Sequence, residues 1–327
     1  MAFHKDVLKI DPAAVTEELT AHLRRDVRQT LRRSGAVVGI SGGVDSSVVL
    51  ALCVRAFGPK RVVGVMMPER DSSRDSLVLA RKVADRFGVE TVVEDMTGAL
   101  VGFGCYARRD EAIKRTFPEY NPGYKAKITL PGNVLESDAL NVFYLTIITP
   151  EGEEKSKRLN PRDYLQIVAA SNFKQRSRMA MLYYHAELRN YAVVGTPNKN
   201  EHDQGFFVKW GDGGYDVAPI RHLYKTQVYQ LAEYLDVPLK IRQATPTTDT
   251  YPAHSSQEEF FFRLPFEVMD LLWYAQEHNV PVAEVAQVMG LTEEQVQRAF
   301  SDFERKRRTT AYLRTMPIEC GDRPPRG

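Results

Sequence analysis

Residues 36–47 read AVVGISGGVDSS, and this stretch decides the fold. Ala36 to Ile40 is an apolar run without alternation, which predicts a short strand buried on both faces. Ser41 to Ser47 is a glycine-rich turn, and Val48 to Phe57 continues as an apolar helix that Gly58 ends. A strand, a glycine-rich turn and a helix in this order indicate the start of a parallel βαβ unit.

The segments on either side continue this pattern. Upstream, Asp11 is a good N-cap followed by proline, and apolar residues recur every four positions up to Leu31, which predicts a helix. Downstream, residues 61–67 and 91–93 are apolar strands that flank a helix ending at Phe87. The alternation predicts an α/β fold with a doubly wound, parallel and right-handed open sheet.

The alternation breaks between Cys105 and Arg162, a range in which we expect an inserted excursion without regular helix–strand alternation. Within it, residues 141–149 and 154–159 flank a Pro-Glu-Gly step and predict a β-hairpin. Helix and strand resume at Ser171, and residues 257–310 are expected to form a helical C-terminal layer. We expect one domain over the whole chain of 327 residues, with the excursion inserted in it.

The composition is that of an ordinary globular protein, with 43% hydrophobic and 26% charged residues. Because 44 Lys and Arg face 42 Asp and Glu, the net charge is only +2 and creates no general field for polyanions. The three cysteines form no CxxC pair, which indicates reduced thiols. The N-terminal stretch has no apolar signal segment, and no run of residues is apolar enough to cross a membrane. We therefore expect a cytoplasmic protein that binds neither nucleic acid nor membranes.

The glycine-rich turn has the features of a phosphate-binding loop. Glycines allow successive N–H groups to point at one anion, and the following helix adds its N-terminal dipole. The turn is neither a Walker A loop nor GxGxxG, so neither a P-loop kinase nor a Rossmann dehydrogenase is favoured. Asp45 would repel a phosphate unless Mg²⁺ bridges the carboxylate to it. The turn therefore predicts a site for a phosphate and Mg²⁺ together.

The SGGVDSS stretch resembles the signature of ATP pyrophosphatases, which cleave ATP between the α and β phosphates. Four further segments resemble NAD synthetase in particular and follow in that family's order: NFKQRSRM at 172–179, VGTPNKNE at 194–201, GFFVKWGDGGYD at 205–216 and LYKTQ at 223–227. The resemblance covers nearly the whole chain outside the excursion. It implies the adenine nucleotide alpha hydrolase-like fold of the ATP pyrophosphatases.

The resemblance also implies roles for individual residues. The implied ATP-binding residues are Gly39, Ile40, Ser41, Gly42, Gly43, Val44, Asp45, Ser46, Ser47, Thr196, Lys225 and Thr247. Asp45 and Lys225 are the implied catalytic residues, and Asp45 and Glu201 would hold Mg²⁺, because carboxylates suit that hard ion. The acid substrate is assigned to Arg176, Lys209, Asp216, Arg305 and Lys306.

The activity implied by the resemblance is the ATP-dependent amidation of deamido-NAD (nicotinic acid adenine dinucleotide) by ammonia. The products are NAD, AMP and pyrophosphate, and the intermediate is an acyl adenylate. The family is a homodimer with the acid site at the subunit interface, so we expect a homodimer, with the first helix as a plausible contact. We recognise no glutamine amidohydrolase segment, so ammonia is expected to arrive free or from a separate glutaminase.

Three features depart from the family's pattern and leave alternatives open. Its Glu-His-Lys-Arg segment corresponds to residues 304–307, where Arg305 replaces the histidine; residues 250–266 lack a Leu-Gly step; and the excursion is long. All three lie near the expected acid site, so an amide ligase for a different carboxylate is the main alternative. Residues 281–308 also resemble a DNA-binding helix–turn–helix with a basic end, which leaves a non-enzymatic regulator as a second alternative. Their acidic residues would repel DNA phosphates.

Overall fold

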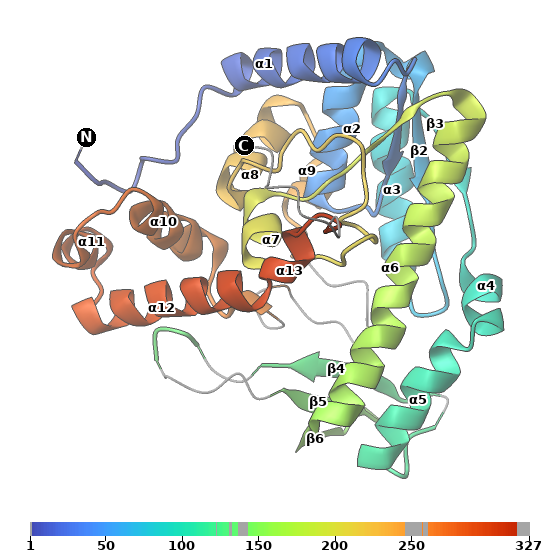
Figure 1. Cartoon of the computed structure of the whole chain (residues 1–327), viewed down its shortest axis with the longest axis vertical. Coiled ribbons are helices and arrows are strands. Elements are labelled where there is room, and N and C mark those ends of the chain that lie inside the picture. The colour runs from blue at the N-terminus through green and yellow to red at the C-terminus, as the bar shows by residue number, and fades with distance from the viewer. Residues whose placement is uncertain are drawn as a thin grey trace.

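The computed structural model describes residues 2–121, 123–130, 133–136, 143–245, 257 and 261–318. Its centre is a four-stranded parallel sheet in the order β3-β2-β1-β7, and a three-stranded antiparallel sheet, β4-β5-β6, lies apart from it (Figure 1). The parallel strands are β1 Ala36–Gly39, β2 Val62–Met66, β3 Glu90–Val93 and β7 Ala192–Val194. The parallel pairing confirms the predicted α/β sheet.

Helices cover both faces of the central sheet. They are α1 Pro12–Arg25, α2 Val44–Phe57, α3 Arg74–Phe87, α6 Pro161–Arg189 and α8 Lys225–Tyr234. Val38 and Val194 point into a core that α1, α2, α3 and α8 share, whereas Val37 and Val193 point into a second core against α6. Because successive strand residues face opposite sides, apolar runs without alternation bury both faces. This arrangement confirms the predicted doubly wound sheet.

The first helix has the predicted start and a different end. The Asp11 carboxylate accepts hydrogen bonds from the N–H groups of Ala13 and Ala14, at 3.0 and 3.2 Å. The α-helix ends at Arg25, and the chain continues as a π-helix, Asp26–Thr30, in which Val27 is fully buried. The prediction of one regular helix to Leu31 is therefore wrong for its last turn.

The excursion contains more regular structure than expected. It includes α5 Cys105–Thr116, which follows α4 Thr97–Gly102, and the strands β4 Lys125–Thr129, β5 Tyr144–Ile148 and β6 Glu154–Arg158. The predicted hairpin is confirmed, since Tyr144 pairs with Arg158 and Ile148 with Glu154. Helix α5 was not predicted, and it buries Ala112 and Ile113 against the small sheet. Strand β4, which pairs with the other edge of β5, was not predicted.

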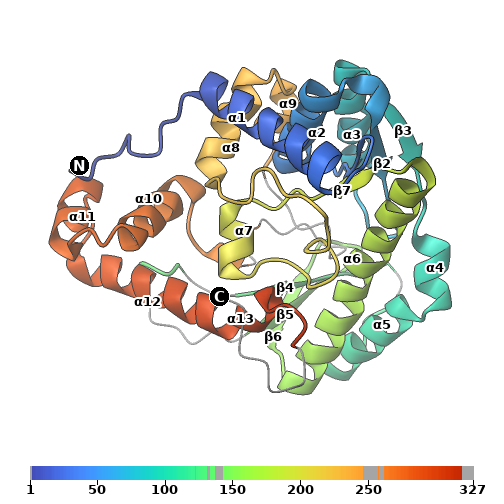
Figure 2. The same ribbon diagram turned by 45° about the horizontal axis from the view of Figure 1, so that its top comes forward.

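Helix α6 begins ten residues earlier than the sequence indicates, at Pro161 instead of Ser171. Figure 2 shows it running from the small sheet to the central sheet. Ile167, near its start, packs into the core of the small sheet, whereas Ala186, near its end, packs into the core of the central sheet. The apolar residues of α6 therefore face different partners along the helix and form no single stripe.

The described residues contain seven further helical segments. They are the 3-10 turn Pro59–Arg61, α7 Lys199–Gln204, α9 Leu239–Arg242, α10 Phe266–Glu277, α11 Val282–Met289, α12 Glu293–Thr309 and α13 Ala311–Arg314. Helices α10, α11 and α12 enclose a core of their own, in which Met269, Trp273 and Phe303 are buried. Phe3 and Leu8 from the N-terminus join this core. Among the described residues, no helix is long and apolar enough to cross a membrane.

Candidate active site

The glycine-rich loop leaves β1 at its carboxyl end and enters α2. Gly42 has φ +83°, and a Cβ there would lie 2.6 Å from the carbonyl oxygen of Ser76. Only glycine fits such a position, because it tolerates positive φ and leaves room for the neighbouring backbone. The hydroxyls of Ser46 and Ser47 donate to the Gly43 carbonyl, at 3.1 and 2.8 Å. The loop is thus held in one shape, with the N-terminus of α2 behind it.

Asp45, in the first turn of α2, meets residues from two other elements. Its Oδ2 forms an ion pair with Nζ of Lys225, the first residue of α8. Its Oδ1 accepts a hydrogen bond from Asn198 Nδ2 at 3.1 Å. Lys225 is fully buried, which favours its neutral form, but the negative charges of Asp45 and Glu201 outweigh burial and raise its pKa. The lysine is therefore a buried cation beside the glycine-rich loop.

Glu201 belongs to the same group. It forms a capping box at the start of α7, in which its N–H donates to Asn198 Oδ1 and its carboxylate accepts from the Asn198 N–H at 3.2 Å. Its Oε1 accepts from Gln257 at 3.3 Å. Burial, followed by the charge of Asp45, raises the pKa of Glu201 well above that of an ordinary glutamate. The protein thus places two carboxylates against one lysine.

This charge balance fits a divalent cation. Mg²⁺ is commonly held by one or two carboxylates together with substrate phosphates and water, instead of by a full cage of protein ligands. Asp45 and Glu201 supply such a partial set, and among the described residues Glu201 forms no direct ion pair, although the charge of Lys225 acts on it. In the part of the chain that the structure describes, no cluster of three or more His, Cys, Asp or Glu could hold a metal. Asp45 and Glu201 alone thus fit Mg²⁺ only as part of a ligand set that phosphate oxygens and water complete.

The two remaining predicted ATP contacts have different outcomes. Thr196 is half-buried and lies two residues after β7, at the same edge of the sheet as the glycine-rich loop. Ligands of open α/β sheets bind at this edge, outside the carboxyl ends of the strands. Thr247 lies outside the described residues.

Three of the residues predicted to bind the acid are linked through α6 and β7. Arg176, on α6, donates from Nε to the carbonyl of Lys209 at 3.2 Å. Asp216 accepts from Tyr183 of α6 at 3.0 Å and from the N–H of Val193 at 2.8 Å. Arg176 and Lys209 thus lie side by side.

The side chain of Lys209 is held by residues 312–315, called here the C-terminal segment. Its Nζ donates to the carbonyl oxygens of Tyr312 and Thr315, at 3.0 and 2.6 Å. Arg314, in the same segment, donates to the carbonyl of His202 at 3.0 Å. The C-terminal segment therefore lies directly over the loop that carries Lys209.

The other two predicted acid contacts, Arg305 and Lys306, lie on α12 and share one partner. Both pair with the buried carboxylate of Asp302, at 2.7 and 2.8 Å. Lys306 is buried and also donates to the carbonyl of Phe262 at 3.3 Å, whereas Arg305 is 41% exposed. Of this pair, Arg305 is therefore the one that solvent reaches.

Sequence reasoning missed several residues that organise the site. Asn198 and Asn200 stand within the quoted VGTPNKNE segment, but neither received a role. Asp270 stands between apolar residues of α10, and its sequence neighbours carry no signal for the site. Asn198 bonds both Asp45 and Glu201, and could have been found from its position between two predicted strand-end residues.

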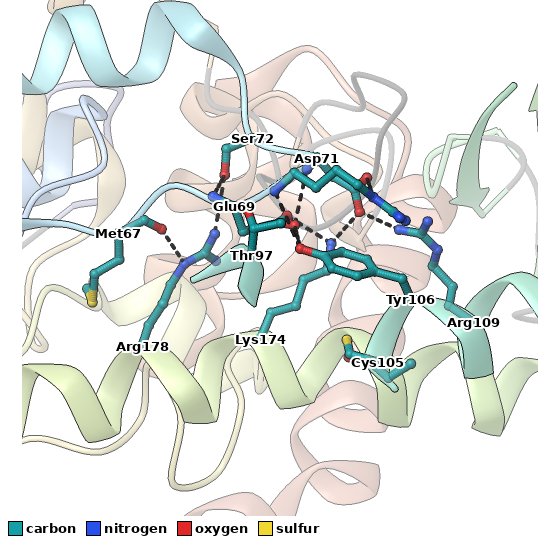
Figure 3. Close-up of polar contacts among 12 residues, drawn as sticks. Met67, Glu69, Asp71, Ser72, Thr97, Cys105, Tyr106, Arg109, Lys174 and Arg178 are labelled. Atoms are coloured by element: carbon teal, nitrogen blue, oxygen red, sulfur yellow. Dashed lines mark hydrogen bonds and ion pairs between the residues drawn. The ribbon is translucent and has the colours of Figure 1, made fainter. Parts of the chain in front are cut away.

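A second polar cluster, also missed, surrounds Glu69 in the loop after β2. Figure 3 shows Lys174 of α6 pointing toward Glu69 and Asp71. Its Nζ lies 2.9 Å from Glu69 Oε1 and 2.7 Å from Asp71 Oδ2. Tyr106 of α5 donates to the other oxygen of Glu69 at 2.6 Å, and Arg109 pairs with Asp71. The four charged side chains are nearly inaccessible to solvent.

The Glu69 cluster connects the excursion to the edge of the central sheet that carries the glycine-rich loop. It joins α5, at the start of the excursion, to α6 and to the loop between β2 and α3. Arg178 holds the same loop from α6, since it donates to the carbonyl of Met67 at 3.2 Å and to Ser72 (Figure 3). The loop leads into α3, whose backbone packs against Gly42. The cluster therefore links α6, which bears Arg176, to the segment that leads into α3, and α3 packs against the glycine-rich loop.

A parallel sheet that presents a glycine-rich loop before a helix is the framework of nucleotide-binding α/β proteins. Within this class, a model of the NAD synthase family matches residues 15–117 and 140–317. The chain belongs to the NAD synthase family.

Known relatives match nearly the whole chain. A protein of Mesorhizobium japonicum named NH(3)-dependent NAD(+) synthetase is 53% identical over 312 residues, which cover 95% of this chain and 98% of that protein. One of Rhizobium meliloti with the same name is 49% identical over 317 residues, or 97% and 94% of the two chains. The ammonia-dependent NAD synthetase of Campylobacter jejuni has a similar fold, with a TM-score of 0.62 at 22% identity over 95% of this chain and all of that one.

Proposed function

We propose that this protein is an ammonia-dependent NAD synthetase, a ligase that converts deamido-NAD, ATP and ammonia to NAD, AMP and pyrophosphate. The observation that carries the proposal is the meeting of Asp45, Lys225 and Glu201 beside the glycine-rich loop. Relatives of 53% and 49% identity that carry this name, matched over nearly their full lengths, support it.

The first step activates the acid. A carboxylate is a poor acyl donor, so the nicotinic acid carboxylate of deamido-NAD attacks the α-phosphorus of ATP, and pyrophosphate leaves. The N–H groups of the glycine-rich loop and the N-terminus of α2 hold the departing phosphates. Lys225 neutralises the negative charge that develops on them. Mg²⁺, held by Asp45 and Glu201 when bound, supplies further positive charge at the phosphates.

The second step forms the amide. Ammonia attacks the carbonyl carbon of the acyl adenylate, a proton is lost, and AMP leaves. This route needs no covalent nucleophile from the protein, and it makes no use of the buried thiols of Cys53 and Cys105. Burial raises the pKa of both thiols, which keeps them protonated and unreactive at neutral pH.

Arg176, Lys209 and Asp216 are proposed to hold the dinucleotide, with Arg305 and Lys306 at its far end. Arginine and lysine suit its phosphates and carboxylate. In this proposal, Lys209 exchanges the carbonyls of Tyr312 and Thr315 for the substrate. Thr196 and Thr247 complete the ATP site.

We further propose that the enzyme is a homodimer, and we revise the contact. Helix α6 presents Leu165, Tyr184 and Leu188 to solvent, each more than half exposed, whereas no large apolar residue of α1 is comparably exposed. Two copies would cover the α6 residues. The cytoplasmic location, a separate glutaminase as ammonia source and the lack of nucleic acid or membrane partners remain predictions.

The proposal is tested by incubating the purified protein with ATP, Mg²⁺, ammonium and deamido-NAD, and by measuring pyrophosphate and NAD. We expect equal amounts of the two products. A panel of other carboxylates, tested in parallel, examines the alternative amide ligase, which the relatives do not favour. Release of pyrophosphate with another acid, and none with deamido-NAD, would contradict the proposal.

A further inference from the structure

Asp270, a fully buried residue of α10, lies at the end of a hydrogen-bond chain that reaches the site. Its Oδ2 accepts from the N–H of Thr226 at 2.8 Å, and its Oδ1 accepts from Nδ2 of Asn200. Oδ1 of Asn200 then accepts from the N–H of Lys225 at 3.2 Å. Among the described residues, Asp270 forms no hydrogen bond with Asp45, Glu201 or the Lys225 ammonium, and it comes from α10 in the C-terminal helical layer.

These hydrogen bonds provide acceptors for the first two N–H groups of α8. Lys225 and Thr226 are its first residues, and the first N–H groups of a helix have no acceptor within that helix. Buried N–H groups without acceptors are costly. Asp270 and Asn200 supply the two acceptors from other elements. Because the N–H of Lys225 can only donate and a carboxylate only accepts, the orientation of the Asn200 amide is fixed.

Two further observations support this relationship. Burial raises the pKa of Asp270 to about 6, against the effect of the hydrogen bond from Asn200, so the carboxylate is ionised and purely an acceptor above that pH. The ring of Phe266, also on α10, lies with its centroid 5.4 Å from Lys225 Nζ. Helix α10 thus contacts the start of α8 at the backbone of Thr226 and at the side chain of Lys225.

We propose that Asp270 is a positioning residue, which acts through Asn200 to fix the start of α8 and so aims the Lys225 ammonium at the phosphates of ATP. The inference rests on the role proposed for Lys225 at ATP. It assigns to the C-terminal layer a part in catalysis, since that layer supplies the carboxylate that holds the lysine in place.

Each donor in this chain has one acceptor, so one isosteric change at Asp270 tests the proposal. In Asp270→Asn, the new amide can accept from Thr226 with its oxygen, but its NH₂ then faces the NH₂ of Asn200. If Asn200 turns over to relieve this clash, its NH₂ faces the N–H of Lys225. Either way, one donor lacks an acceptor. The double change Asn200→Asp with Asp270→Asn restores every donor–acceptor pair, because the carboxylate that replaces the Asn200 amide accepts from both neighbours.

The experiment compares wild-type protein, Asp270→Asn and the double variant. We expect Asp270→Asn to lower kcat by about 10- to 100-fold, since displacement of a catalytic group by about 1 Å has effects of this size. ATP affinity, measured by titration without the acid, should weaken, while the KM for deamido-NAD should change less than about twofold, a difference worth about 0.4 kcal/mol. The double variant should recover at least about tenfold in kcat, or roughly 1.4 kcal/mol.

Asp163→Asn is the matched control. Asp163 is also a buried aspartate that accepts from an asparagine side chain, Asn160 at 2.6 Å, but it lies in the first turn of α6 near the small sheet. This variant should lose stability and keep wild-type kinetics. Wild-type kcat and ATP affinity in Asp270→Asn, or a double variant that folds but stays as slow as the single one, would overturn the inference. If wild-type protein makes no NAD, the proposed function fails instead, while the ATP titration still tests the role of Asp270.

Discussion

Lys225 and Asp45 stand 180 residues apart in the sequence and form a partly buried ion pair beside the glycine-rich loop. Lys225 is the first residue of α8 and is fully buried, whereas Asp45 lies in the first turn of α2. The pair is surrounded by polar partners, since Asn198 bonds Asp45 and the charge of Glu201 also acts on Lys225. The arrangement places a cation and a carboxylate next to the position where the phosphates of ATP are expected.

Asp45→Asn tests this pair. The change keeps the size of the side chain and removes the charge that faces Lys225 and the metal. We expect pyrophosphate release to fall at least about 100-fold, because electrostatic stabilisation of this kind contributes factors of that size. Circular dichroism should show an intact fold. Asp75→Asn, an exposed acid in the first turn of α3, is the control and should be neutral. Near-normal turnover of Asp45→Asn would show that Asp45 does not hold the metal.

The parts of the site that the sequence predicts are those in continuous segments. The strand of residues 36–39 is an unbroken apolar run, and the glycines that follow leave few alternatives for the turn. Asp45 and Glu201 are predictable because each lies just after a strand, where the carboxyl ends of parallel strands meet. Their approach to Lys225 depends on the packing of three separate helices, α2, α7 and α8.

The parts that the sequence does not predict depend on long-range packing. Asp270 is one acid among apolar residues, and its role follows only from the meeting of α10 with α7 and α8. Half of the residues of helix α5 are charged, and Arg109 among them pairs within the Glu69 cluster, so the apolar signal of α5 is weak. The long helix α6 has no single apolar stripe, since its two halves pack on different sheets.

The nitrogen donor is tested by supplying ammonium or glutamine to the purified chain. We expect ammonium to support turnover and glutamine alone to give none, because the family members matched here are named for ammonia. Addition of a separate glutaminase should then restore turnover with glutamine, which shows that the ligase itself is active under those conditions. Efficient use of glutamine by this chain alone would reveal an activity that the site does not explain.

Lys174→Met tests the Glu69 cluster through stability. The change removes the cation between Glu69 and Asp71, and loss of one partner from a buried ion pair costs about 3–5 kcal/mol. Lys155→Met, which breaks only exposed pairs, is the control and should cost less than about 1 kcal/mol. Thermal unfolding of both variants is the measurement. A loss no larger than in the control would show that the cluster is not stabilising.

The destabilisation by Lys174→Met should depend on pH. In the wild type, burial favours a higher pKa for Asp71, but the charges of Lys174 and Arg109 outweigh it and lower the pKa. This carboxylate therefore stabilises the fold above its ordinary pKa, and the contribution is lost as pH falls through the lowered value. Without Lys174, the carboxylate binds a proton more readily, so the variant loses stability as pH rises from about 4. The difference in Tm should be widest near neutral pH and narrow in acid.

Arg176→Ala and Lys209→Ala test the acid site and separate it from the ATP site. If each residue holds a phosphate or carboxylate of the dinucleotide, loss of one charge-assisted contact costs roughly 1.5–3 kcal/mol, or about 10- to 100-fold in affinity. ATP affinity should change little, because the glycine-rich loop and Lys225 remain. Arg162→Ala, an exposed arginine of α6, is the control and should leave both affinities unchanged. Steady-state kinetics with each substrate varied in turn give the comparison. Equal weakening of ATP and acid in both variants would show that Arg176 and Lys209 shape the site as a whole instead of binding the dinucleotide.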